Sequence, residues 1–178
     1  MNKSAILNLI FVLMALMLIS LSCDSQAQQQ PSLEEEILQV NKELLDSNKH
    51  IVKVNALKYI RLTQEFVKEN ADSSKVVKFA IQGAEVAVNI GEHQKAIQSY
   101  DLLVQQFPNN HKVVANALFA KAFILENYLK DIKGARQIYQ SILEKYPNQE
   151  ITKSIQVTLQ NLGKSEAELL EMIKRKNK

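Results

Sequence analysis

The side chains best suited to metal binding or nucleophilic catalysis are one cysteine and three histidines in a chain of 178 residues. Cys23 lies directly after an apolar N-terminal stretch. His50, His93 and His111 have no HExxH motif and no second histidine four residues away, the spacing that places two zinc ligands on one helix face. These residues therefore predict neither a metal site nor a cofactor.

The acidic residues also lack the arrangement of a catalytic pair. Glu34, Glu35 and Glu36 follow one another at an expected helix start, where they interact favourably with the helix dipole but cannot face one another across a cleft. The sequence contains no glycine-rich phosphate loop and no G-x-S-x-G motif. We therefore expect a protein that is not an enzyme.

The charge of the chain is too weak to indicate a nucleic-acid partner. There are 22 Lys and Arg against 19 Asp and Glu, a formal charge of +3 that is spread evenly along the chain. Aromatic residues are not interleaved with the cations, as stacking on bases requires. The basic C-terminus, residues 174–178, is expected to be solvated, with contact to anionic lipid as the alternative.

The N-terminal segment, residues 1–22, has the pattern of a signal peptide. It contains one cation, Lys3, followed by an apolar stretch from Ala5 to Leu21. This stretch is shorter than the roughly 20 residues that a membrane-spanning helix needs, and no stop-transfer charges follow it. We therefore predict export, with an uncleaved anchor as an alternative.

The end of this segment resembles the lipobox of bacterial lipoproteins. In that family a small residue, here Ser22, precedes a cysteine that becomes diacylated, and a dedicated peptidase cuts just before it. Ser20 departs from the family pattern, which usually has an aliphatic residue there. The resemblance implies lipidation at Cys23 and attachment to the membrane through that lipid.

Cleavage by a general signal peptidase after Ala27 is the competing interpretation, because Ser25 and Ala27 have the small-x-small spacing. Under the lipoprotein interpretation, residues 23–32 are the lipidated cysteine and a flexible tether rich in Gln and Ser. The predicted location is the cell envelope, as an outer-membrane lipoprotein or, after cleavage at Ala27, as a soluble periplasmic protein.

Residues 33–178 are predicted to form an all-helical domain. Apolar residues recur at spacings of three and four, Gly and Pro are rare, and no segment alternates as a half-buried strand does. Ser32 with Glu35, and Ser165 with Glu168, have the capping-box spacing that marks a helix start.

The helix boundaries follow from these caps and from the turn residues. The first helix is expected to continue to about residue 47. The second, over residues 51–69, is expected to bury one side. That side contains Val54, Leu57, Leu62 and Phe66. Later breaks are expected at residues 91–92, 108–110, 130–131 and 147–148, and the last helix is expected to end near residue 173.

Two segments of the helical region repeat one another with a period of 39 residues, measured from Ala96 to Ala135. In each segment a tyrosine follows the alanine by four residues, and a proline preceded by an aromatic residue follows the tyrosine by eight. The alternative is a plain helical bundle, in which the residues that end the helices are not expected to recur at a fixed period. The pattern consists of Ala84, Gly91, Ala96, Tyr100, Leu103, Phe107 and Pro108 in the first copy and of Ala122, Ala135, Tyr139, Ile142, Tyr146 and Pro147 in the second, which has no glycine equivalent to Gly91.

This pattern resembles the tetratricopeptide repeat (TPR), which ends in A-x3-F…P and has a usual period of about 34 residues. The resemblance covers about residues 47–163 and is clearest in residues 77–110 and 113–148. In the second copy Leu129 takes the place of Gly91. More specifically, the chain is similar to the short TPR lipoproteins of Bacteroidetes-type bacteria.

The resemblance implies a short right-handed TPR-like α-solenoid of helical hairpins, whose first helices line a concave groove that binds another protein or peptide. Lys and Arg do not line up to clamp a terminal carboxylate. Asn89 and Asn127 are candidates for holding an extended peptide backbone, with capping of helix ends as the alternative. The implied groove residues are Lys78, Ile81, Glu85, Val88, Asn89, Asn116, Phe119, Phe123, Glu126 and Asn127.

The function predicted from the sequence is a non-catalytic, membrane-anchored TPR scaffold for protein–protein interaction in the bacterial cell envelope. The alternative is a structural accessory subunit of an outer-membrane assembly or cell-wall complex. The sequence does not name the partner, the oligomeric state or the process served.

Overall fold

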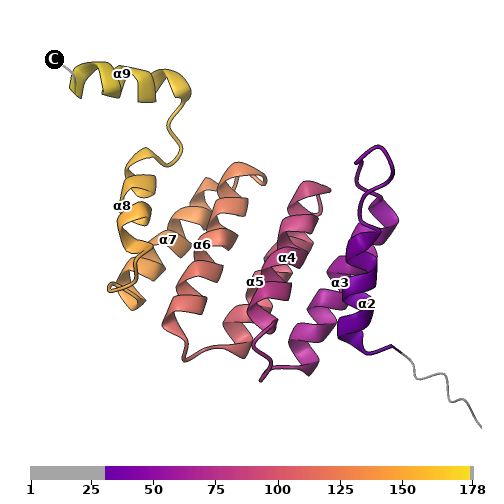
Figure 1. The fold of residues 1–178 in the computed structure, drawn as a ribbon. Coiled ribbons are helices and arrows are strands. Elements are labelled where there is room, and N and C mark those ends of the chain that lie inside the picture. Colours follow the sequence, from indigo (N-terminus) through magenta and orange to yellow (C-terminus); the bar gives the residue numbers. More distant parts are fainter. Residues whose placement is uncertain (1–30, 177–178) are drawn as a thin grey trace, which may run out of the picture. The chain divides into compact units, whose positions relative to one another are not determined.

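The computed structural model describes residues 31–176, which fold into α-helices joined by short turns (Figure 1). Within this part the only β pairing is an isolated bridge between Leu45 and Ile51. The predicted all-helical class is confirmed there, whereas the signal peptide, Cys23 and nearly all of the tether lie outside the described residues. The helices are α2 (Leu33–Lys42), α3 (Lys53–Glu69), α4 (Val76–Asn89), α5 (His93–Gln106), α6 (His111–Asn127), α7 (Ile132–Lys145), α8 (Thr152–Asn161) and α9 (Glu166–Lys176).

Each helix from α2 to α7 packs against the next one along the chain, and α3 also contacts α5. The elements therefore form three successive hairpins, α2–α3, α4–α5 and α6–α7, followed by α8 (Figure 1). Contacts between chain neighbours of this kind are typical of repeat proteins, in which each unit covers the apolar face of the one before it.

The predicted helix stops are confirmed in both copies of the repeat. Helix α5 ends two residues before Pro108, and α7 ends two residues before Pro147, because proline lacks an amide donor and restricts the residue before it. Both capping boxes are also present. Ser32 and Glu35 bond reciprocally at the start of α2, as Ser165 and Glu168 do at α9.

The first helix is shorter than predicted, since α2 ends at Lys42 rather than near residue 47. The physical reason is the Asp46 side chain, whose Oδ1 accepts hydrogen bonds from the backbone amides of Asn48 (2.8 Å) and His50 (2.9 Å). This local arrangement competes with helical hydrogen bonding and turns the chain back.

The predicted buried side of α3 is partly wrong. Val54 is 71% exposed, and Leu57 is only partly buried, whereas Leu62 and Phe66 belong to the core. Because α3 contacts α2, α4 and α5, its buried surface is wider than one apolar stripe, and it includes Tyr59.

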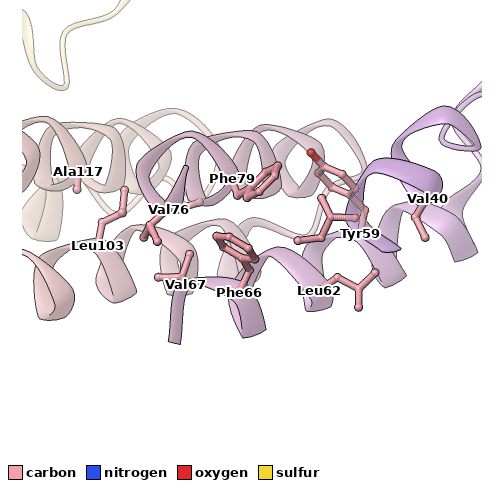
Figure 2. Packing of buried hydrophobic residues seen from close by; sticks show 11 residues of the cluster. Val40, Tyr59, Leu62, Phe66, Val67, Val76, Phe79, Leu103 and Ala117 are labelled. Atoms are coloured by element: carbon pink, nitrogen blue, oxygen red, sulfur yellow. The ribbon is translucent and has the colours of Figure 1, made fainter. Parts of the chain in front are cut away.

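The core between the first two hairpins is built around paired aromatic rings. Phe66 of α3 and Phe79 of α4 meet edge to face with centroids 4.9 Å apart, and Leu62, Val67 and Val76 surround them (Figure 2). A second cluster joins α6, α7 and α8. The hydrophobic core is thus distributed along the row of hairpins.

The turn inside each repeat contains one residue with a positive φ angle, Gly91 (φ 78°) in the first copy and Lys130 (φ 57°) in the second. Helices α5 and α7 start 39 residues apart, as Gly91 and Lys130 lie 39 apart, but α4 and α6 end 38 apart. The predicted match of Gly91 with Leu129 is therefore wrong by one residue. The second copy therefore has one more residue between the end of its first helix and the positive-φ residue. In both copies the positive-φ residue directly precedes the N-cap of the second helix.

Candidate binding groove

A cavity of about 560 Å³ opens between α4 and α6, the first helices of the two repeats. Helix α5 contributes one residue, and the C-cap of α6 contributes another. We call this cavity the α4–α6 groove. Its lining residues are Glu85, Val88, Asn89, Tyr100, Phe119, Ala120, Phe123, Ile124 and Tyr128.

The structure brings half of the predicted groove residues together in this cavity. They lie at helical spacings on α4 and α6, and both helices line the same cavity. Their positions are observed, whereas their role in binding stays a prediction. The five residues are Glu85, Val88, Asn89, Phe119 and Phe123.

Three other predicted residues lie outside the α4–α6 groove. Lys78 and Ile81 are exposed nearer the start of α4 and do not line it. Asn116 lines a separate cavity of about 390 Å³, between α6 and the segment that leads into α8, together with Gln149 and Ile151. The predicted groove residues thus do not all line one cavity.

The last two predicted residues make contacts within the fold. Glu126 accepts a hydrogen bond from the Tyr139 hydroxyl at 3.1 Å, which links α6 to α7. Burial, followed by the charge of Glu126, raises the pKa of Tyr139. The Asn127 amide donates to the Phe123 carbonyl at 3.0 Å, the local bond expected of a residue at a helix end.

Two aromatic residues of the groove were not among the predicted site residues. Tyr100 of α5 lies half-buried at the groove. Tyr128 belongs to the turn with the extra residue, and its ring stacks on His93 with centroids 4.6 Å apart. The sequence offered one indication of this position, since the turn of the second copy contains a tyrosine and the turn of the first copy does not.

The groove is mainly apolar and aromatic, with one ionisable carboxylate, Glu85. The rings of Phe123 and Tyr128 meet edge to face at 6.3 Å, and Phe119 packs against Tyr139 at 5.6 Å. Apolar hollows with a few polar groups are typical of binding sites.

Metal and membrane features can be described only for residues 31–176. In that part of the chain, no group of three or more His, Cys, Asp or Glu residues is placed to hold a metal ion. No helix in the same range combines the length and apolar character needed to cross a membrane.

Comparison with known proteins supports the repeat. The family model described as tetratricopeptide repeat matches residues 82–110 and 116–148, which end at the same residues as the two predicted copies. No curated protein and no solved structure matches the chain. The match supports a protein with two tetratricopeptide repeats, and repeats of this family generally bind other proteins.

Proposed function

We propose that this protein is a non-catalytic interaction scaffold that binds a segment of another polypeptide in the α4–α6 groove. The observation that carries the proposal is the position of the cavity, which lies between the first helices of the two segments matched by the repeat family. The resemblance to that family further leads us to infer a right-handed solenoid whose concave side contains the groove.

The side chains of the groove suit an apolar anchor from a partner. Val88 and Phe119 are half-buried, and Phe123 is 45% exposed although it is a large aromatic residue. Exposed aromatic residues beside a hollow are the groups that commonly dominate protein–protein binding energy. Binding would cover Phe123 and remove its apolar surface from water.

The first prediction tests this groove through Phe123→Ala. Crosslinking and mass spectrometry on intact cells should join the wild-type groove to another polypeptide. The variant should lose those crosslinks and bind that polypeptide about tenfold more weakly or worse, as expected for a central aromatic residue. Leu38→Ala on α2 is the matched control, because Leu38 is 47% exposed and lies outside the groove. Equal loss in both variants would contradict the proposed site.

We further propose that the scaffold is held at the cell envelope through a lipid on Cys23. This part of the proposal is supported by the sequence pattern around Cys23 and by the polar segment that follows it. Several acyl chains on one residue would give stable anchoring, since each buried methylene contributes about 0.8 kcal/mol. The folded hairpins would then stand off the membrane on the tether.

The second prediction concerns this anchor. In cell fractionation, Cys23→Ser should move the protein from the membrane to the soluble fraction, because the variant has no thiol to acylate. Ala27→Leu is the matched variant, since it should leave a lipoprotein unchanged but block general signal-peptide cleavage. A wild-type N-terminus at Gln28, found by mass spectrometry, would establish the alternative processing.

A structural accessory subunit of an outer-membrane assembly or cell-wall complex is the second candidate function. It is favoured by exposed apolar residues of α9, Leu170, Met172 and Ile173, since obligate complexes cover such surface. A partner that stays bound through purification at high salt would favour this candidate. Transient capture of a peptide segment would favour the scaffold.

A further inference from the structure

The carboxylate of Glu85 has no cation facing it in the α4–α6 groove. No lysine, arginine or histidine lines the cavity, and no ion pair within residues 31–176 includes Glu85. Some acidic residues elsewhere on the hairpins do have such partners. Glu36 lies 2.8 Å from Lys58, and Asp101 lies 2.7 Å from Lys121.

The surroundings of Glu85 strengthen its attraction for a cation. Glu85 is an exposed residue whose charge water can screen, but aromatic and aliphatic side chains make up most of the cavity wall beside it, and low-polarity walls reduce that screening. The faces of Phe and Tyr rings also attract Lys and Arg side chains. The Glu85 charge acts on the groove itself, since burial and then that charge raise the pKa of Tyr100.

Resting on the function proposed above, we propose that the groove selects a polypeptide segment in which a lysine or arginine lies beside an apolar residue. The cationic head pairs with Glu85, and the apolar side chain packs against Phe119 and Phe123. Asn89, four residues after Glu85 on α4, lines the same cavity and offers an amide to the backbone of the segment. The charge preference is thus opposite to that of a site for a terminal carboxylate.

The test is selection from a display library of random ten-residue peptides on the full chain. The wild-type protein should enrich Lys and Arg next to apolar residues. Glu85→Gln, which keeps the shape of the side chain, should lose the enrichment of Lys and Arg and keep that of apolar residues. Glu85→Lys should enrich Asp and Glu. The matched control is Glu144→Gln, because Glu144 is exposed on α7 and outside the groove.

A double-mutant cycle then measures the interaction between Glu85 and the basic residue of the peptide. The most enriched peptide and its analogue with glutamine at the basic position are titrated by fluorescence anisotropy against wild type and Glu85→Gln. Glu85→Gln should weaken the basic peptide about threefold to fivefold, as for a partly exposed ion pair, and leave the analogue unchanged.

Two results would overturn the inference in distinguishable ways. Peptides that bind wild type without an excess of Lys and Arg, or equal selection by wild type and Glu85→Gln, would contradict the charge preference and leave the scaffold function standing. If wild type selects no peptide at all while circular dichroism shows it folded, the groove function fails and the inference fails with it.

Discussion

Side-chain hydrogen bonds at helix starts have measurable electrostatic effects. At α2, the Glu35 carboxylate accepts from the Ser32 amide at 2.8 Å and from the Ser32 hydroxyl at 3.0 Å. These bonds favour the charged form and hold the pKa of Glu35 below its ordinary value. The same arrangement at Ser165 lowers the pKa of Glu168. Both carboxylates therefore stabilise the fold only while they are ionised.

The third prediction follows from these shifts. Because the folded pKa of Glu35 is lowered, its stabilising effect is present above the unfolded pKa and is lost as the pH falls through the folded pKa. Ser32→Ala removes the hydroxyl donor but keeps the backbone amide, which is the larger cause of the shift, so the pKa of Glu35 should rise only part of the way toward its ordinary value. NMR titration of the side-chain carboxyl measures this change. Ser165→Ala is the matched control, since it should move only the pKa of Glu168. No change in the pKa of Glu35 after Ser32→Ala would contradict a contribution from the Ser32 hydroxyl.

The hairpins are joined by close helix contacts as well as by aromatic packing. Gly83 of α4 is buried against Thr63 of α3, and a Cβ atom on Gly83 would lie 2.2 Å from Thr63 Oγ1 and 3.1 Å from Thr63 Cβ. Thr63 has little freedom to move away, because it is β-branched and its hydroxyl donates to the Ile60 carbonyl at 2.9 Å. The glycine thus sets the distance between two helices.

The fourth prediction applies to this contact. Overpacking by Gly83→Ala should cost about 1–3 kcal/mol, against a gain of about 1 kcal/mol in helix propensity, so the variant should be less stable than wild type by up to about 2 kcal/mol. Urea denaturation measures the change in the free energy of unfolding. Adding Thr63→Ala removes the nearest atom and should recover part of the loss. A Gly83→Ala variant more stable than wild type would show that the helices can separate at no penalty.

One element outside the two matched repeats follows their geometry. Ala56, Ala96 and Ala135 are each the fourth residue of α3, α5 and α7, and all three are fully buried. The second helix of the first hairpin, α3, therefore shares this feature with the second helices of the two matched repeats. The family model begins only at residue 82, and no proline follows α3 as Pro108 and Pro147 follow α5 and α7.

At the scale of the whole molecule, stability is divided among neighbouring hairpins. One core cluster holds Leu62 together with residues of α2 to α6, and another holds Ile142 together with residues of α6 to α8. A smaller cluster, which includes Ile97, joins residues of α3 to α6. In such arrays each unit is stabilised mainly by its neighbours, so that local damage spreads over a limited distance.

The fifth prediction compares the two ends. Ile142→Ala and Leu62→Ala remove side chains that are at most 1% exposed, and each should destabilise its surroundings by about 2–5 kcal/mol. Amide hydrogen exchange should show the largest loss of protection in α6 to α8 for the first variant and in α2 to α4 for the second. Equal loss along all helices in both variants would indicate a single cooperative core.

The sequence by itself determined the helical class, most helix ends and the duplicated hairpin, since caps, prolines and apolar spacing act within a few residues. The alignment of the two repeats also identified five of the nine residues that line the α4–α6 groove. The tertiary structure alone decided that α3 buries a wide surface and that Asn116 lies in a different hollow. It also showed that Tyr100 and Tyr128 complete the α4–α6 groove. These features depend on contacts between different helices, and the pattern within one helix contains no information about which neighbour covers a given face.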